Sequence, residues 1–209
     1  MASRGFFSRF AVLVVVLVSA GALSGSANAT LLGGACGARQ FSKPFLRWLD
    51  PMNYTLSPDG GFESGARGWT LKGGAVVQTG NEPWKVRGAN DSRSLYLPSG
   101  STAMTPPICV ETLDPTVRYF AKNRGLVALS SLVVEVVLLD SSGRPVLALP
   151  AGVHTGFSSW HPSLPGVALL NLTALLNGGK ANVAFRFRPV GLGAKWQIDD
   201  VYVDPLKMG

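Results

Sequence analysis

The sequence is poor in the side chains that most often build metal centres and catalytic triads. Its 209 residues include two histidines and two cysteines, all widely spaced, so a zinc site with four Cys or His ligands is not expected. No His-Glu-x-x-His motif is present, and the segment 156–160 (Gly-Phe-Ser-Ser-Trp) does not fit the Gly-x-Ser-x-Gly turn that presents a nucleophilic serine. These absences argue against metalloprotease and serine hydrolase chemistry.

Charged residues are also sparse, at 15% of the chain, and the basic ones are scattered rather than gathered in runs. A segment that binds nucleic acid usually shows blocks of Lys and Arg, so no nucleic-acid partner is expected. With 12 acidic residues, the chain offers few candidates for the two facing carboxylates that a glycoside hydrolase uses. The sequence selects no such pair, and no catalytic residue is nominated.

Long hydrophobic runs are missing after the first 20 residues. The N-terminal run, at 10–20, follows two arginines and precedes the small-residue pattern Ala-Asn-Ala at 27–29. This arrangement predicts a signal peptide at 1–29, cleaved before Thr30, rather than a retained membrane anchor. We therefore expect a secreted or cell-surface protein with no membrane span after cleavage.

The expected mature chain is mildly basic. The leader holds two of the 19 basic residues and none of the 12 acidic ones, so 17 basic and 12 acidic residues remain, a net charge of +5. An exported protein of this charge suits anionic polymers of the cell surface as partners, although solubility alone is another explanation.

Cys36 and Cys109 are the two cysteines. Outside the cytoplasm an even number of cysteines favours a disulfide over two free buried thiols. The bond would close a loop of about 70 residues, which in the chain-entropy view stabilises the fold appreciably. It would also fasten an N-terminal arm, at 30–52, to the domain that follows.

From residue 53 onward, short apolar runs alternate with turn signals such as Pro-Asp-Gly-Gly at 58–61 and Asp-Ser-Ser-Gly at 140–143. This alternation is typical of an all-β domain. The predicted strands are 54–56, 69–72, 75–79, 94–97, 103–105, 117–122, 132–139, 145–149, 167–170, 182–189 and 196–203. The segment 132–139 is apolar on both faces, which favours a central position in its sheet.

Two predicted strands have informative side-chain patterns. In 182–189, three apolar residues alternate with Arg186 and Arg188, which indicates a half-buried strand with a basic outer face. In 196–203 the alternation slips, so either both faces are covered or a β-bulge lies at 199–200.

The chain thus divides into a signal peptide (1–29), an arm (30–52), a β-sandwich (53–205) and a tail (206–209). A helical turn is expected in the arm at 44–49. One short helix is expected at 171–178, where three leucines have helical spacing and Gly178 can end the helix.

Four segments resemble a known family. Gly-Phe-Glu at 61–63 and Gly-Trp-Thr at 68–70, together with 183–187 and 196–201 (Trp-Gln-Ile-Asp-Asp-Val), resemble the opening and closing strands of carbohydrate-binding modules with a galactose-binding-like jelly-roll fold. The resemblance covers 53–204 and implies a jelly-roll sandwich whose first and last strands are neighbours. As a whole the chain resembles small secreted bacterial proteins.

The resemblance also implies a structural calcium ion between the first and last strands. Its carboxylate ligands would be Glu63 and one of Asp199 or Asp200, with backbone carbonyl groups completing the shell. The alternative is that the aspartates are exposed or accept hydrogen bonds from turn N–H groups.

A carbohydrate site requires open aromatic side chains beside polar groups. Two of the five tryptophans, Trp69 and Trp196, fall in closing strands and are expected in the core. The candidate ligand-binding residues, in loop-like or outward-facing positions, are Trp84, Lys85, Arg87, Tyr96 and Trp160. Packing is the alternative for each aromatic residue, because large aromatics are mostly buried.

These features favour a secreted, non-enzymatic module that binds carbohydrate or an anionic cell-envelope polymer. One alternative is a structural or protein-interaction domain of the cell surface without a small ligand. A glycoside or ester hydrolase is the weakest alternative. Fold resemblance alone does not decide among these functions.

Overall fold

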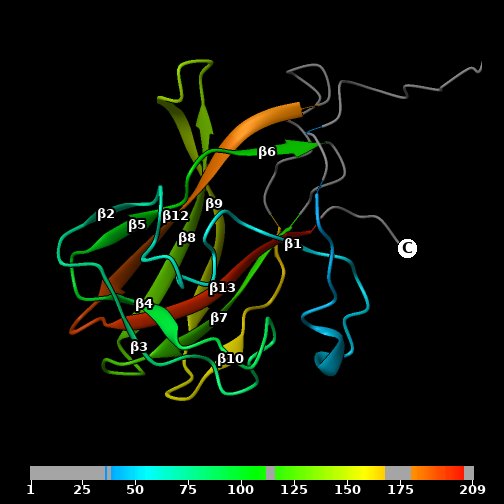
Figure 1. Cartoon of the computed structure of the whole chain (residues 1–209). Coiled ribbons are helices and arrows are strands. Elements are labelled where there is room, and N and C mark those ends of the chain that lie inside the picture. Colours follow the sequence, from blue (N-terminus) through cyan, green and yellow to red (C-terminus); the bar gives the residue numbers. More distant parts are fainter. Residues whose placement is uncertain (1–35, 37–38, 112–115, 168–179, 205–209) are drawn as a thin grey trace, which may run out of the picture. The chain divides into compact units, whose positions relative to one another are not determined.

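Two antiparallel β-sheets lie face to face with an apolar core between them (Figure 1). The computed structural model describes residues 36, 39–111, 116–167 and 180–204. No helix in these ranges is long and apolar enough to cross a membrane. The predicted signal peptide, the predicted helix at 171–178 and the predicted tail lie outside the described residues.

The last strand of the chain lies in the middle of the first sheet. β13 (Trp196–Asp204) pairs with β4 (Arg93–Leu97) on one side and with β7 (Thr116–Asn123) on the other. β4 then pairs with β3 (Val76–Thr79). On the other side, β7 pairs with two short strands, β10 (His161–Pro162) and β11 (Gly166–Val167).

The first strand, β1 (Thr55–Leu56), also pairs with β13, with Thr55 opposite Val203. The first and last strands of the domain are therefore neighbours, but the first strand is β1, whereas the opening segment of the resemblance, at 68–70, leads into a strand of the second sheet.

The second sheet is built around β12 (Lys180–Gly191) and β8 (Ser130–Leu139), which pair along almost their whole length. β8 pairs on its other side with the edge strand β9 (Pro145–Thr155), so its predicted central position is confirmed. The remaining strands of this sheet are β2 (Thr70–Lys72), β5 (Thr102–Met104) and β6 (Ile108–Glu111).

The predicted all-β jelly-roll sandwich is confirmed, but two short strands, β6 and β10, were not predicted. β9 also continues to Thr155, well past its predicted end at residue 149. Pro150, one residue past the predicted end, is tolerated because β9 is an edge strand with one side free of sheet hydrogen bonds.

A β-bulge in β13 explains the slip in side-chain alternation. The register between β13 and β7 shifts between Asp199 and Tyr202, and Asp200 has a left-handed φ of 47°. As a result, Ile198 before the bulge and Val201 after it both face the core and are fully buried.

The predicted core residues are buried. Phe185 and Phe187 of β12 are inaccessible to solvent, as is Trp196, while Trp69 is 8% exposed. The indole of Trp196 donates a hydrogen bond to Ser130 Oγ (2.9 Å) and that of Trp69 donates to the Pro58 carbonyl (2.9 Å), so neither buried polar group is left unsatisfied.

The N-terminal arm packs on the outer side of the first sheet. Its predicted helical turn is present as a short 3-10 helix, Leu46–Trp48. Phe45 is fully buried there, in a cluster with Tyr54, Phe120 and Tyr202. These side chains form a second, smaller core, through which the arm covers part of the first sheet.

The predicted disulfide is present between Cys36 and Cys109, which are 73 residues apart. It joins the arm to β6. Because the bond limits the freedom of the unfolded chain, Cys36→Ser combined with Cys109→Ser should lower the free energy of unfolding by up to about 4 kcal/mol.

Chemical denaturation of the oxidised protein and of the double variant measures this difference. Chemical reduction of the wild-type protein should have the same effect as the double substitution. A change below about 0.5 kcal/mol would show that the arm and the sandwich are held together by packing alone.

Candidate functional site

A row of polar and aromatic side chains crosses the outer face of the first sheet. In the strand register, Gln197 of β13 lies between Tyr96 of β4 and Lys122 of β7. All three face away from the core, because Leu95, Leu97, Ala121, Trp196 and Ile198, their neighbours along these strands, face into it.

Two tryptophans continue this row at the β7 side. The Lys122 ammonium lies 5.4 Å from the ring centroid of Trp160, a cation–π arrangement. Trp84 packs edge-on against Trp48 of the arm, with ring centroids 4.8 Å apart, and lies against Phe120. We name the set Trp84, Tyr96, Lys122, Arg124 and Trp160 the outer platform.

The centre of the outer platform is held rigidly. The Gln197 side-chain amide donates to Ser94 Oγ (2.7 Å), and that hydroxyl donates to the Gly80 carbonyl (2.6 Å). Arg124 donates to Gln197 Oε1 (3.3 Å). Gln197 is almost fully buried, so it supports its neighbours and leaves Tyr96, Lys122 and Trp160 as the half-buried groups at the surface.

The outer platform is basic. Within the part of the chain that the structure describes, neither Lys122 nor Arg124 forms an ion pair with a carboxylate. Burial lowers the pKa of Lys122, and the nearby positive charge of Arg124 lowers it further. An acidic ligand would relieve this repulsion.

The structure therefore brings together three of the candidate ligand-binding residues, Trp84, Tyr96 and Trp160, on one face. Lys85 is exposed beside them, in the loop whose Ala89 carbonyl accepts its hydrogen bond (2.7 Å). Arg87 is not part of this face, because its guanidinium points to Asp91 and Asp200.

Two buried carboxylates position the Trp84 loop, and sequence reasoning missed one of them. Glu82 is inaccessible to solvent and accepts hydrogen bonds from the backbone N–H groups of Trp84 and Val86. The Glu82 N–H in turn donates to Asp199 (3.3 Å). Nothing in the sequence distinguishes Glu82 from an exposed loop glutamate.

The outer face of the second sheet is different in kind. Glu135 is held between Arg186 and Arg188, which donate from Nε to the same carboxylate oxygen at 2.7 and 2.9 Å. Burial alone would raise the pKa of Glu135, but these hydrogen bonds lower it. Phe185 and Phe187, the aromatic residues of the described strands in this sheet, both face the core, so this face lacks an aromatic platform.

The expected calcium ligands occupy three different environments. Glu63 accepts hydrogen bonds from the N–H groups of Ser92 (2.8 Å) and Arg93 (2.9 Å). Burial raises the pKa of Glu63, but these hydrogen bonds outweigh it and the net shift is downward. Asp199 accepts from the Asp200 N–H (2.9 Å) as well as from Glu82.

Asp200 alone has both carboxylate oxygens buried without a hydrogen-bond partner in the described chain. The Arg87 Nε lies 3.8 Å from one of them, and Arg87 Nη1 lies 3.6 Å from Asp91. Burial raises the pKa of Asp200 and of Asp199, and for Asp199 the neighbouring Asp200 charge adds to the effect.

The described residues contain no group of three or more His, Cys, Asp or Glu side chains placed to hold a metal ion. The calcium hypothesis therefore stays a prediction, with Asp200 as the member of the aspartate pair that has oxygens to offer.

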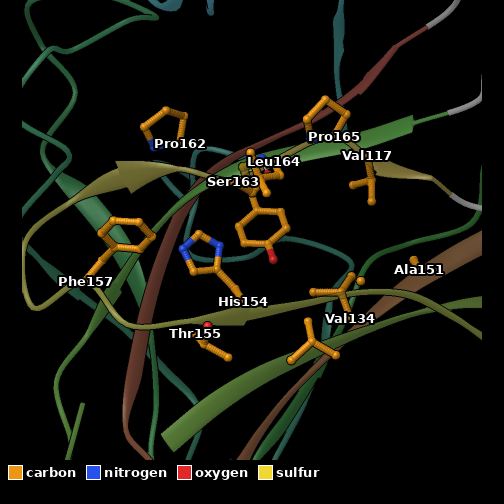
Figure 2. Close-up of a pocket in the computed structure, with 13 residues that line it drawn as sticks. Val117, Val134, Ala151, His154, Thr155, Phe157, Pro162, Ser163, Leu164 and Pro165 are labelled. Carbon is orange, nitrogen blue, oxygen red and sulfur yellow. Dashed lines mark hydrogen bonds between the residues drawn. The ribbon is translucent and has the colours of Figure 1, made fainter. Parts of the chain in front are cut away.

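The two histidines lie near each other but do not form a recognisable catalytic group. His161, at the start of β10, is half-buried; its Nδ1 is 3.4 Å from Ser159 Oγ, and its ring stacks on Phe157. His154 is buried among aromatic rings at the edge of a cavity between the sheets (Figure 2). Among the described residues, neither ring forms a hydrogen bond or an ion pair with a carboxylate.

No protein-family model matches the sequence, and no curated protein matches it either. Solved structures that resemble it include the CBM22-1 xylan-binding domain of Paenibacillus barcinonensis Xyn10C, at 15% identity and a TM-score of 0.48 over 72% of this chain and 94% of that one. TmCBM61 in complex with β-1,4-galactotriose resembles it at 13% identity and a TM-score of 0.40, over 71% and 96%.

The family 22 carbohydrate-binding module of Clostridium thermocellum Xyn10B resembles the chain at 13% identity and a TM-score of 0.42, over 72% and 94%. At these identities and TM-scores the likeness assigns neither a family nor a ligand. Evidence for a ligand must therefore come from the side chains of the site.

His154 should make stability depend on pH. Burial lowers its pKa from about 6.5 to about 4, helped by the charge of His161. Between these values the unfolded chain binds a proton that the folded chain does not, so stability is lost as the pH falls from 6.5 to 4, by about 3 kcal/mol.

Denaturation at a series of pH values measures this loss. His154→Phe should flatten the dependence in that window, whereas His161→Phe, in β10, should largely keep it. Equal slopes in the wild type and in His154→Phe would contradict the prediction.

Proposed function

We propose that the protein is a non-enzymatic module that binds a carbohydrate or an anionic cell-envelope polymer across the outer platform. The observation that carries the proposal is the row Tyr96, Lys122 and Trp160, with Gln197 fixed beneath it. The sequence motifs that resemble carbohydrate-binding modules support the same class of ligand.

The chemistry of the outer platform suits such a polymer. Tyr96 and Trp160 each offer an aromatic surface and a polar atom, and aromatic faces pack well against the apolar C–H faces of sugar rings. Lys122 and Arg124 attract carboxylate, sulfate or phosphate groups on the polymer. Their positions on one face favour an extended ligand that crosses the strands.

A hydrolytic role has less support. Asp199 and Asp200 are fully buried rather than set across a cleft, and Glu135 is engaged by two arginines. Glycosidases need two accessible carboxylates that face one bond, and the described residues offer no such pair near the outer platform.

Removing one aromatic side chain should weaken binding. Trp160→Ala and Tyr96→Ala should each reduce affinity about tenfold, because stacked aromatics are frequent centres of binding energy. Glycan arrays and polysaccharide pull-downs identify the ligand, and calorimetry measures the change. Val146→Ala, which removes an exposed apolar side chain from β9 of the second sheet, is the control.

The charged part of the proposal has its own readout. Lys122→Gln with Arg124→Gln should weaken binding to acidic polymers and reduce its salt dependence, whereas Lys72→Gln on the other sheet should not. No binding to any neutral or acidic glycan at millimolar concentration would overturn the proposal in favour of a structural or protein-interaction domain, which crosslinking on the cell surface would identify.

We also propose that a structural calcium ion binds at Asp200, with one further carboxylate, from Asp91 or Glu63, and backbone carbonyl groups completing its shell, since the described residues hold no cluster of three such side chains. Two observations support it: both oxygens of Asp200 and one of Asp91 are buried and unpartnered in the described chain, and Ca²⁺ prefers carboxylate oxygens. The ion would supply positive charge and connect the opening turn to the last strand. Arg87, which is part-exposed, would have to withdraw.

Calcium should raise the melting temperature, and chelation should lower it. At a concentration 100 times the dissociation constant, binding stabilises the folded state by about 2.7 kcal/mol. Asp200→Asn should abolish the response, whereas Asp140→Asn, in an exposed turn, should retain it. A melting temperature indifferent to calcium, with Arg87→Gln strongly destabilising, would instead identify Arg87 as the counter-ion.

A further inference from the structure

A cavity of about 390 Å³ opens between the two sheets, away from the outer platform (Figure 2). Its lining comes from β7 of the first sheet, from β8 and β9 of the second, and from the segment that follows β9. It therefore lies where the open edges of the two sheets approach each other. Its volume is within the range of about 300–1,000 Å³ that is usual for small-molecule sites.

The segment over the cavity is hydrogen-bonded to the first sheet. Ser163 separates β10 from β11, and its N–H donates to the Tyr119 carbonyl of β7 (2.7 Å) while its Oγ accepts from the Tyr119 N–H (3.1 Å). The Arg118 guanidinium also donates to the Ser163 carbonyl (2.9 Å). On either side, Pro162 and Pro165 have no N–H group with which to close the gap toward β9.

The inner walls of the cavity are apolar. Val117, Val134 and Ala151 line it from three different strands and are also part of the core. At the mouth, Leu164 is 85% exposed and Phe157 is 48% exposed. An apolar cavity whose rim also exposes large apolar side chains is suited to an apolar guest.

Four lining residues have polar side chains, namely Tyr119, His154, Thr155 and Ser163, and the first two have large rings. Tyr119 is in the lining and almost fully buried. His154 is 7% exposed, and its Nε2 has no hydrogen-bond partner in the described chain. Its ring is fixed edge-on against Trp196 and Phe157, with centroids 5.5 and 5.7 Å away. The Tyr119 and His154 rings both line the cavity, so a guest that hydrogen-bonds either of them would offset part of the cost of burying polar groups there.

We infer that this cavity binds an uncharged amphiphilic molecule, with an aryl or short acyl body and a hydroxyl or carbonyl group that hydrogen-bonds His154 or Tyr119. The site is separate from the outer platform and goes beyond the proposed polymer binding.

The absence of charge around the cavity selects against an ionic guest. None of the described residues that line it is Lys, Arg, Asp or Glu. Burial keeps His154 neutral at neutral pH, because its pKa is lowered to about 4, and it raises the pKa of Tyr119. An anion would lose its hydration and find no cation in exchange, although the net charge of the mature chain, 17 − 12 = +5, would attract it.

A matched pair of fluorescent probes tests this selectivity. N-phenyl-1-naphthylamine is uncharged, and 8-anilino-1-naphthalenesulfonate has the same rings with a sulfonate added. The full mature protein should bind the neutral probe at one site and the anionic probe at least tenfold more weakly. Equal or tighter binding of the anionic probe would overturn the inference.

Variants locate the probe. Ala151→Phe fills the cavity and should weaken the neutral probe at least tenfold, whereas Val146→Phe, exposed on the same strand, should not. Should Ala151→Phe fail to fold, Leu164→Asp at the exposed mouth should weaken the probe several-fold, with Leu192→Asp, exposed elsewhere, as its control. Binding that is absent, or indifferent to the cavity variants, would refute the site.

The polar contact has a separate measurement. 2-Naphthol and naphthalene should both displace the probe. After correction for their difference in hydrophobicity, 2-naphthol should bind about fivefold more tightly, because its hydroxyl can either donate to or accept from the imidazole. His154→Phe should keep the aromatic packing and lose this preference. Loss of glycan binding would leave all these outcomes unchanged, so the two proposals fail independently.

Discussion

The position of β13 in the middle of the first sheet is the constraint on which the rest of the structure depends. It pairs with β4, β7 and β1, which come from three distant parts of the chain. Its bulge at Asp199 and Asp200 keeps apolar residues facing the core on both sides of the irregularity. It also turns Tyr202 outward, where the arm packs against it. The sandwich, the arm and the outer platform therefore share one strand.

The same bulge buries two carboxylates that have separate tasks. Asp199 reaches the Trp84 loop through Glu82, while Asp200 faces Arg87. The conformation of an aromatic loop on the surface thus depends on acidic groups that solvent does not reach. Buried carboxylates of this kind are costly unless they are neutralised or hydrogen-bonded, which makes the counter-ion of Asp200 central to the stability of this end of the domain.

Much of the architecture follows from local sequence signals. The structure confirms three such predictions: the side-chain alternation in β12, the break in alternation at the bulge of β13, and the disulfide. The first two follow from strand geometry, and the third follows from the oxidising conditions expected outside the cytoplasm. β9 was predicted too short, because the effect of Pro150 depends on the strand lying at a sheet edge, and that is a property of the whole fold.

The sites were less predictable than the fold. Trp84, Tyr96 and Trp160 were identified from their surroundings, but that they share a face follows from the strand order of the first sheet. Glu82 and the cavity beside His154 leave no local trace, because burial and open space arise only when distant segments pack. The disulfide also determines how mechanical force enters the domain. Tension applied at Cys36 would pass through Cys109 into β6 and then into β12. The residues between the two cysteines, which include Trp84 and Tyr96, would carry no load, so part of the outer platform is shielded from a pull on the N-terminal side.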